Sequence, residues 1–117
     1  MYIEPKKRIV KALSRLLEAT QHACSEYGCS LSWNTKGSTE RNFRSRIQTM
    51  QNQINQFDID WDDEYSDIDE NADELVSEID EIINDLKLMV NPSSWDEVID
   101  MQISDAETAV KKFGYYN

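Results

Sequence analysis

The acidic and hydroxyl side chains between Asp58 and Asp69 have types and spacing that resemble a calcium-binding loop. Positions one, three, five, seven and nine of this stretch carry oxygen atoms, and the twelfth is a carboxylate. Two departures weigh against Ca²⁺. The sixth position, where the loop needs glycine for its sharp turn, is Asp63, and the twelfth is aspartate rather than a bidentate glutamate. A solvated acidic turn is the stronger interpretation, and we predict no metal.

The remaining side chains suited to chemistry are His22, Cys24 and Cys29. One histidine and two cysteines cannot supply the four ligands of a zinc site. Phosphate loops, dinucleotide fingerprints and nucleophile elbows are also absent from a sequence with three glycines. We therefore predict a protein that is not an enzyme and has no cofactor. His22 is expected on a helix surface, near Glu18 and Glu26.

The first ten residues, MYIEPKKRIV, contain no apolar core of signal-peptide length, and no stretch approaches a membrane span. These features predict a cytoplasmic protein with reduced thiols. A Cys24–Cys29 disulfide is expected only if the chain is exported.

Four segments repeat apolar residues at steps of three and four, which indicates helices with one buried face. The first runs from Pro5 to Tyr27, and Gly28 stops it. The second begins near Ser38 or Thr39, and the third runs from near Ser66 to Asn91-Pro92. The fourth opens with the capping pattern of residues 94–97 and is expected to close at Gly114. The stripes comprise Ile9, Leu13, Leu16, Thr20, Ala23 and Tyr27; Phe43, Ile47, Met50, Ile54 and Phe57; Ile68, Ala72, Leu75, Ile79, Ile82, Leu86 and Met89; and Ile99, Ile103, Ala106, Val110 and Phe113.

This pattern predicts one all-α domain over residues 1–117, a four-helix bundle, with a short extended segment near residues 29–33 as an open alternative to a loop. A homodimer held by the same heptad stripes is the competing interpretation.

Charge divides the chain into two unequal parts. The net charge is −11, yet residues 1–50 hold nine bases and four acids, while residues 51–117 hold three bases and nineteen acids. The acidic total argues against nonspecific nucleic-acid binding and against anionic membranes, and it favours basic partners. The basic residues of the first half, among them Arg8 and Arg15, are more simply explained as a helix-pairing face for the acids than as a nucleic-acid patch.

The acidic segment, residues 58–85, contains fourteen acids and no Lys or Arg. On the third helix, Glu70, Glu74, Glu78 and Glu81 fall on one flank of the apolar stripe, and Asp69, Asp73 and Asp80 fall on the other. Like charges three or four residues apart repel each other by a few tenths of a kcal/mol, so such clustering calls for a reason. The predicted partner-binding residues are Asp58, Asp60, Trp61, Asp62, Asp63, Glu64, Tyr65, Asp67, Asp69, Glu70, Asp73, Glu74, Glu78, Asp80 and Glu81.

Carboxylates four residues apart on a helix stand about 6 Å apart, on the scale of phosphates along a nucleic-acid strand. In size, charge and helicity the chain is similar to the DNA-mimic inhibitors carried by phages and mobile elements. That similarity implies occupation of the positive nucleic-acid-binding site of a CRISPR effector, restriction enzyme, nucleoid protein or repair protein, without direct contact to nucleic acid. Trp61 and Tyr65 are candidate anchors within the acids, or equally caps of the core.

Two other functions fit the same sequence. An immunity protein or antitoxin that neutralises a nuclease toxin would use similar acids with a more aromatic contact. A structural or adaptor bundle would form a dimer through the heptad stripes.

Overall fold

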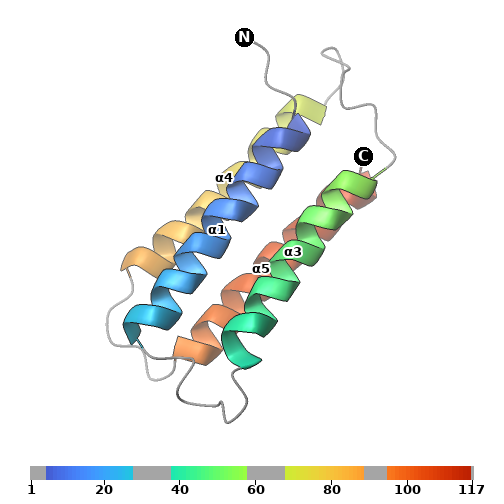
Figure 1. Ribbon diagram of the computed structural model, residues 1–117. Coiled ribbons are helices and arrows are strands. Elements are labelled where there is room, and N and C mark those ends of the chain that lie inside the picture. Colours follow the sequence, from blue (N-terminus) through green and yellow to red (C-terminus); the bar gives the residue numbers. More distant parts are fainter. Residues whose placement is uncertain (1–4, 28–37, 58–67, 89–94, 117) are drawn as a thin grey trace.

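The computed structural model describes residues 5–27, 38–57, 68–88 and 95–116; the side chains of residues 24–27, 38–41, 69, 95–96 and 115–116 lie outside this description. Four helices account for these ranges: α1 (Pro5–Tyr27), α3 (Ser38–Gln56), α4 (Ile68–Leu88) and α5 (Trp95–Tyr116). The predicted all-α four-helix bundle is therefore confirmed (Figure 1). The extended segment considered near residues 29–33 lies outside the described residues.

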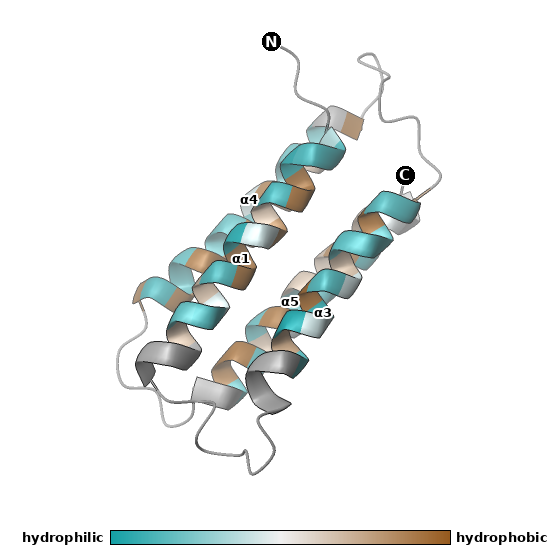
Figure 2. Cartoon of the chain, viewed as in Figure 1, coloured by the Kyte–Doolittle hydropathy of each residue, from teal (hydrophilic) through white to brown (hydrophobic). Residues whose placement is uncertain are grey.

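The predicted apolar stripes form a single core. Every stripe residue with a described side chain is buried except Phe57, which is half-buried, and Ala12, Ile83 and Ala109 are buried beside them. Hydrophobic and hydrophilic residues alternate along each helix (Figure 2), and the buried side chains are almost all hydrophobic. Because all four stripes are buried within one chain, a dimer would need a different surface.

The helices pack so that α1 lies between α3 and α4, with α5 on the opposite side, also between α3 and α4. Neighbours α1 and α4 run in the same direction, as do α3 and α5, while α1 and α3 are antiparallel (Figure 1). Helices α3 and α4 therefore occupy diagonally opposite corners. This arrangement turns the outer faces of α3 and α4 away from each other.

Gly114 corrects one prediction, because it lies inside α5, which continues to Tyr116, and does not close the helix. A Cβ atom at this position would approach the Phe57 ring, at 2.8 Å from Cε1 and 2.9 Å from Cε2. Phe57 in turn packs on Phe113, with ring centroids 6.3 Å apart. The glycine is therefore explained by close packing of α5 against an aromatic ring rather than by a helix end.

Candidate interaction surface

Among the described residues, Arg8 and Arg15, seven residues apart on α1, form ion pairs with Asp73 and Asp80, seven residues apart on α4. Arg8 Nη2 lies 3.2 Å from Asp73 Oδ1, and Arg15 Nη2 lies 3.0 Å from Asp80 Oδ1. The side chains of Asp73 and Asp80 remain 70% and 47% exposed, so each pair is worth about 1 kcal/mol or less. These are the contacts expected if bases of the first half pair with acids of the second.

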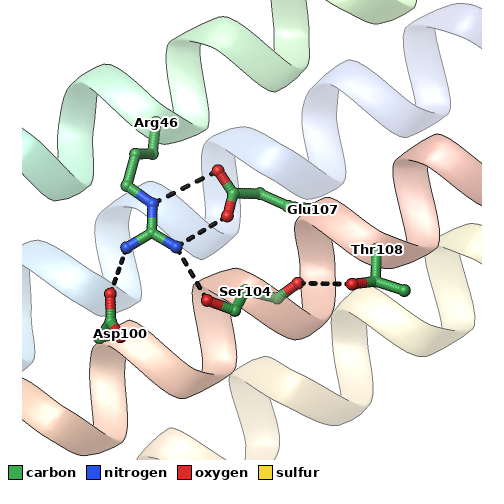
Figure 3. Close-up of polar contacts among 5 residues, drawn as sticks. All are labelled: Arg46, Asp100, Ser104, Glu107 and Thr108. Carbon is green, nitrogen blue, oxygen red and sulfur yellow. Dashed lines mark hydrogen bonds and ion pairs between the residues drawn. The ribbon is translucent and has the colours of Figure 1, made fainter.

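A denser polar cluster joins α3 to α5 around Arg46 (Figure 3). Its guanidinium donates to both carboxylate oxygens of Glu107, at 2.7 and 3.3 Å, to Asp100 Oδ1 at 2.5 Å, and to Ser104 Oγ at 3.0 Å. The arginine side chain is only 22% exposed. This bidentate arrangement, in which two guanidinium nitrogens donate to the two oxygens of one carboxylate, is the strong form of the ion pair. Arg46 is therefore a structural residue that holds α3 against α5.

The Arg46 cluster changes the titration of its central group. The hydrogen bond to Glu107 raises the pKa of Arg46 above its ordinary value, and this outweighs desolvation by burial, which acts in the opposite direction. The guanidinium is charged at any working pH, and Glu107 and Asp100 are committed to it. A partner protein would have to compete with Arg46 for these two acids of α5, whereas an unpaired carboxylate can bind a partner directly.

The acids of α4 divide between its two flanks as predicted from the helical spacing. Asp73 and Asp80 face α1 and form the ion pairs described above. On the other flank and the outer face, Glu70, Glu74, Glu81 and Asp85 are exposed and Glu78 is half-exposed. None of these five carboxylates forms an ion pair or hydrogen bond with another described residue. We call Glu70, Glu74, Glu78, Glu81 and Asp85 the α4 acidic row.

Basic side chains are scarce beside the α4 acidic row. A small depression between α4 and α5 is lined by Glu74 and Glu78 on one side and by Lys112 on the other. Asp105, also exposed, lies on α5 seven residues, or two helical turns, before Lys112. The described charged residues beside the row are thus mostly acidic, with Lys112 of α5 near the end where α4 begins.

The remaining predicted site residues lie outside the description. Asp58, Asp60, Trp61, Asp62, Asp63, Glu64, Tyr65 and Asp67 fall in residues 58–67, and the side chain of Asp69 is also not described. The calcium-loop alternative falls on the same residues. In the described parts of the chain, no group of three or more His, Cys, Asp or Glu residues is placed to hold a metal ion.

A cleft of about 560 Å³ lies between α1 and α4 near their C-terminal ends. Its walls carry Arg15, Glu18, His22, Asp80 and Lys87 over a floor that includes Ala23 and Leu86. Both signs of charge are present in equal number, with Arg15 and Asp80 already paired. The cleft therefore selects neither an anionic nor a cationic ligand by charge.

Two exposed apolar residues were not singled out from the sequence. Leu88 is 77% exposed and Met101 is 60% exposed, although both belong to large hydrophobic types. Both lie toward the end of the bundle where α4 ends and α5 begins (Figure 1). Their positions off the apolar stripes were the available signal, since a heptad pattern places neither of them in the core.

Searches against protein-family models, curated proteins and solved structures find no match to this chain. None of the described helices is both long enough and apolar enough to span a membrane.

Proposed function

We propose that this protein is a non-enzymatic acidic inhibitor that acts as a DNA mimic. The α4 acidic row would occupy the positively charged nucleic-acid-binding site of another protein and so exclude nucleic acid. The observation that carries the proposal is a row of five carboxylates on one side of one helix, four exposed and one half-exposed, without ion-pair partners among the described residues.

The spacing of the row supports this function. Its members follow one another at steps of four, four, three and four residues along α4. With a rise of about 1.5 Å per residue, the row extends over about 22 Å, and its carboxylates succeed one another every 5–6 Å. A rigid helix thus offers an ordered line of anions to a groove built for phosphates, which favours fast, salt-sensitive association.

The basic residues of the first half whose side chains are described form no ion pair with this row. Arg8, Arg15 and Arg46 are engaged with Asp73, Asp80 and the two acids of α5. Leu88 and Met101 add exposed apolar area toward one end of the row, where a partner could bury them. We therefore leave Asp73 and Asp80 out of the proposed contact and place the row and these two residues in it.

The test is competition on a captured partner. The protein, tagged and immobilised, is incubated with lysates from candidate bacterial hosts, and bound proteins are eluted with duplex DNA at constant ionic strength. If the protein is a DNA mimic, duplex DNA should displace captured nucleases, nucleoid proteins or repair proteins from it. Elution by salt alone, with no effect of DNA, would contradict the proposal. A partner that is a toxin and stays bound in the presence of DNA would favour an immunity function instead.

A matched pair of variants assigns the contact to α4. Glu74→Gln with Glu81→Gln removes two charges of the row, whereas Glu18→Gln with Glu97→Gln removes two exposed charges from α1 and α5. Both changes shift the net charge equally. We expect the first pair to weaken capture about tenfold or more, and the second pair by less than about threefold, because only the first lies in the contact. Equal losses would show that the whole-molecule charge, and not the row, drives binding.

A further inference from the structure

The depression between α4 and α5 gives one part of the α4 acidic row an apolar floor. Leu75 of α4 and Ala109 and Phe113 of α5 line it, and all three side chains are buried. Glu74 and Glu78 stand on its α4 side, one helical turn apart. Of the five acids of the row, these two alone line the depression. The row is therefore not uniform, because only this part of it combines carboxylates with apolar surface.

The size and lining of the depression fit a single side chain. Its volume is about 100 Å³, whereas pockets that take small-molecule ligands have about 300–1,000 Å³. The occupant must be cationic at one end, to face Glu74 and Glu78, and apolar along its length, to cover the floor. Lysine and arginine both join an aliphatic stem to a charged head. Arginine fits better, because its guanidinium has five donors for two carboxylates and is more weakly hydrated than an ammonium.

Lys112 stands on the α5 side of the same depression. Its side chain is exposed and forms no ion pair or hydrogen bond with another described residue. It therefore leaves Glu74 and Glu78 unpaired in the free protein. Its charge repels an incoming cation, so Lys112 weakens the binding of an arginine at this place without replacing it.

We infer that this depression is an anchor pocket that takes one arginine side chain of the partner protein. The guanidinium binds Glu74 and Glu78, and the stem of the arginine covers the floor formed by Leu75, Ala109 and Phe113. The inference rests on the proposed function, since it takes the α4 acidic row as the contact. A line of carboxylates alone accepts any basic groove, whereas an anchor pocket requires an arginine at one position. Arginine is among the residues that contribute most to protein interfaces.

A peptide tests the anchor pocket without the partner. The probe is a capped seven-residue peptide in which three arginines alternate with glycines, so that successive cations lie about 6.6 Å apart in an extended chain. We expect it to shift the amide NMR signals of Ala109 and Phe113 as well as those of the row. The control peptide replaces each arginine by its homologue with one methylene group instead of three. It keeps the charge but cannot cover the floor, so it should bind at least about fivefold more weakly and leave the Ala109 and Phe113 signals unshifted.

Two matched pairs of variants locate the contact. Glu74→Gln and Glu81→Gln each remove one charge of the row, but only Glu74 lines the anchor pocket. We expect E74Q to weaken binding of the arginine peptide about fivefold, and E81Q less than about twofold. Lys112→Gln and Lys111→Gln each remove one exposed positive charge of α5, and only Lys112 lines the pocket. K112Q should strengthen binding about threefold, and K111Q less than about twofold.

Equal affinities of the two peptides overturn the inference, as do equal effects within either pair of variants. An arginine peptide that shifts no amide signal of α5 overturns it as well. Circular dichroism on each variant confirms that it is folded. These outcomes are independent of the competition with duplex DNA. A uniform row without an anchor can still release its partner to DNA. If the arginine peptide occupies the pocket but DNA does not displace the captured partner, the anchor pocket stands and the proposed function fails.

Discussion

Arg15 and Asp80 form an ion pair 3.0 Å long, one heptad beyond the pair formed by Arg8 and Asp73. Both pairs join residues 65 positions apart, which is possible because α1 and α4 are parallel neighbours. Bases from the first half of the chain thus meet acids of the second at a fixed register. Because the pairs are largely exposed, each adds little to the stability of the fold. Their main effect is to favour α1 and α4 as neighbours in this register.

A double-mutant cycle measures this coupling. We expect Arg15→Gln and Asp80→Asn to show an interaction energy of about 0.2–1 kcal/mol in urea unfolding, because both side chains are about half exposed. The coupling should shrink in high salt. The cycle of Arg15→Gln with Glu81→Gln should give a coupling near zero, since Glu81 lies on the other flank of α4. A comparable coupling in both cycles would mean that the pair has no specific role.

Arg46 should contribute more to the free energy of unfolding than either of the exposed ion pairs between α1 and α4. Arg46→Ala leaves Glu107 and Asp100 without their partner, and we expect a loss of about 2 kcal/mol in the free energy of unfolding. Arg46→Lys keeps the charge but loses the bidentate hydrogen bonds to Glu107, and should lower the free energy of unfolding by about 1 kcal/mol. A lysine variant as stable as wild type would show that charge alone is needed.

The pH dependence of the Arg46 effect follows from the direction of its pKa shift. The hydrogen bond to Glu107 raises the pKa of Arg46 above its ordinary value, so the stabilisation is fully present below the unfolded pKa and is lost only as the pH rises through the higher folded pKa. The difference in stability between wild type and R46A should therefore be the same at pH 7 and at about pH 10. Thermal melts at the two pH values check it; a difference that falls by pH 10 would contradict the assignment.

Gly114→Ala should reverse the usual sign of a glycine-to-alanine change in a helix. Alanine normally stabilises a helix interior by up to about 1 kcal/mol. Here its Cβ would overlap the Phe57 ring, and we expect a loss of about 1–2 kcal/mol. In a Phe57→Ala background the obstacle is gone, so the same substitution should become neutral or stabilising. Destabilisation of the same size in both backgrounds would rule out the ring contact as the cause.

The helices and core could be predicted from sequence because residues such as Ile47, Ile79 and Ile103 repeat with the helical period, and burial follows that period closely. The structural role of Gly114 could not be predicted from sequence. A glycine near the end of a helical pattern gives the same sequence signal whether it ends the helix or makes room for a ring such as Phe57. The partner of Arg46 also depends on which helices are neighbours. Four stripes alone do not say that α3 lies beside α5 and diagonal to α4. Asp73 and Glu74 are adjacent in sequence, yet Asp73 pairs with Arg8 of α1, whereas Glu74 lies on the side of α5 and forms no ion pair with a described residue. Which helix each acid faces depends on the same packing order.

Thr20 is the one described polar side chain that is buried in the core, 1% exposed, and its Oγ1 has no hydrogen-bond partner. Burying an unpaired hydroxyl costs about 1–3 kcal/mol. Thr20→Val keeps the shape and removes the hydroxyl, so we expect it to raise the free energy of unfolding by about 1 kcal/mol, as measured in urea. Thr20→Ser keeps the hydroxyl and removes a methyl group, and should be destabilising by about 1 kcal/mol. A destabilised T20V protein would show that the hydroxyl is satisfied in solution.

Removing a charge from the α4 acidic row should make the protein more stable and a poorer inhibitor. Glu81 stands three residues after Glu78 and four before Asp85, so it is repelled from both sides along one helix. We expect Glu81→Gln to raise the free energy of unfolding by about 0.3–1 kcal/mol in dilute buffer, and by less in about 0.5 M NaCl because salt screens the repulsion. Glu18→Gln, with His22 rather than an acid four residues on, is the control and should show no such gain. If E81Q were less stable than wild type, Glu81 would have a partner within the fold, and the case for an unpaired row would fail.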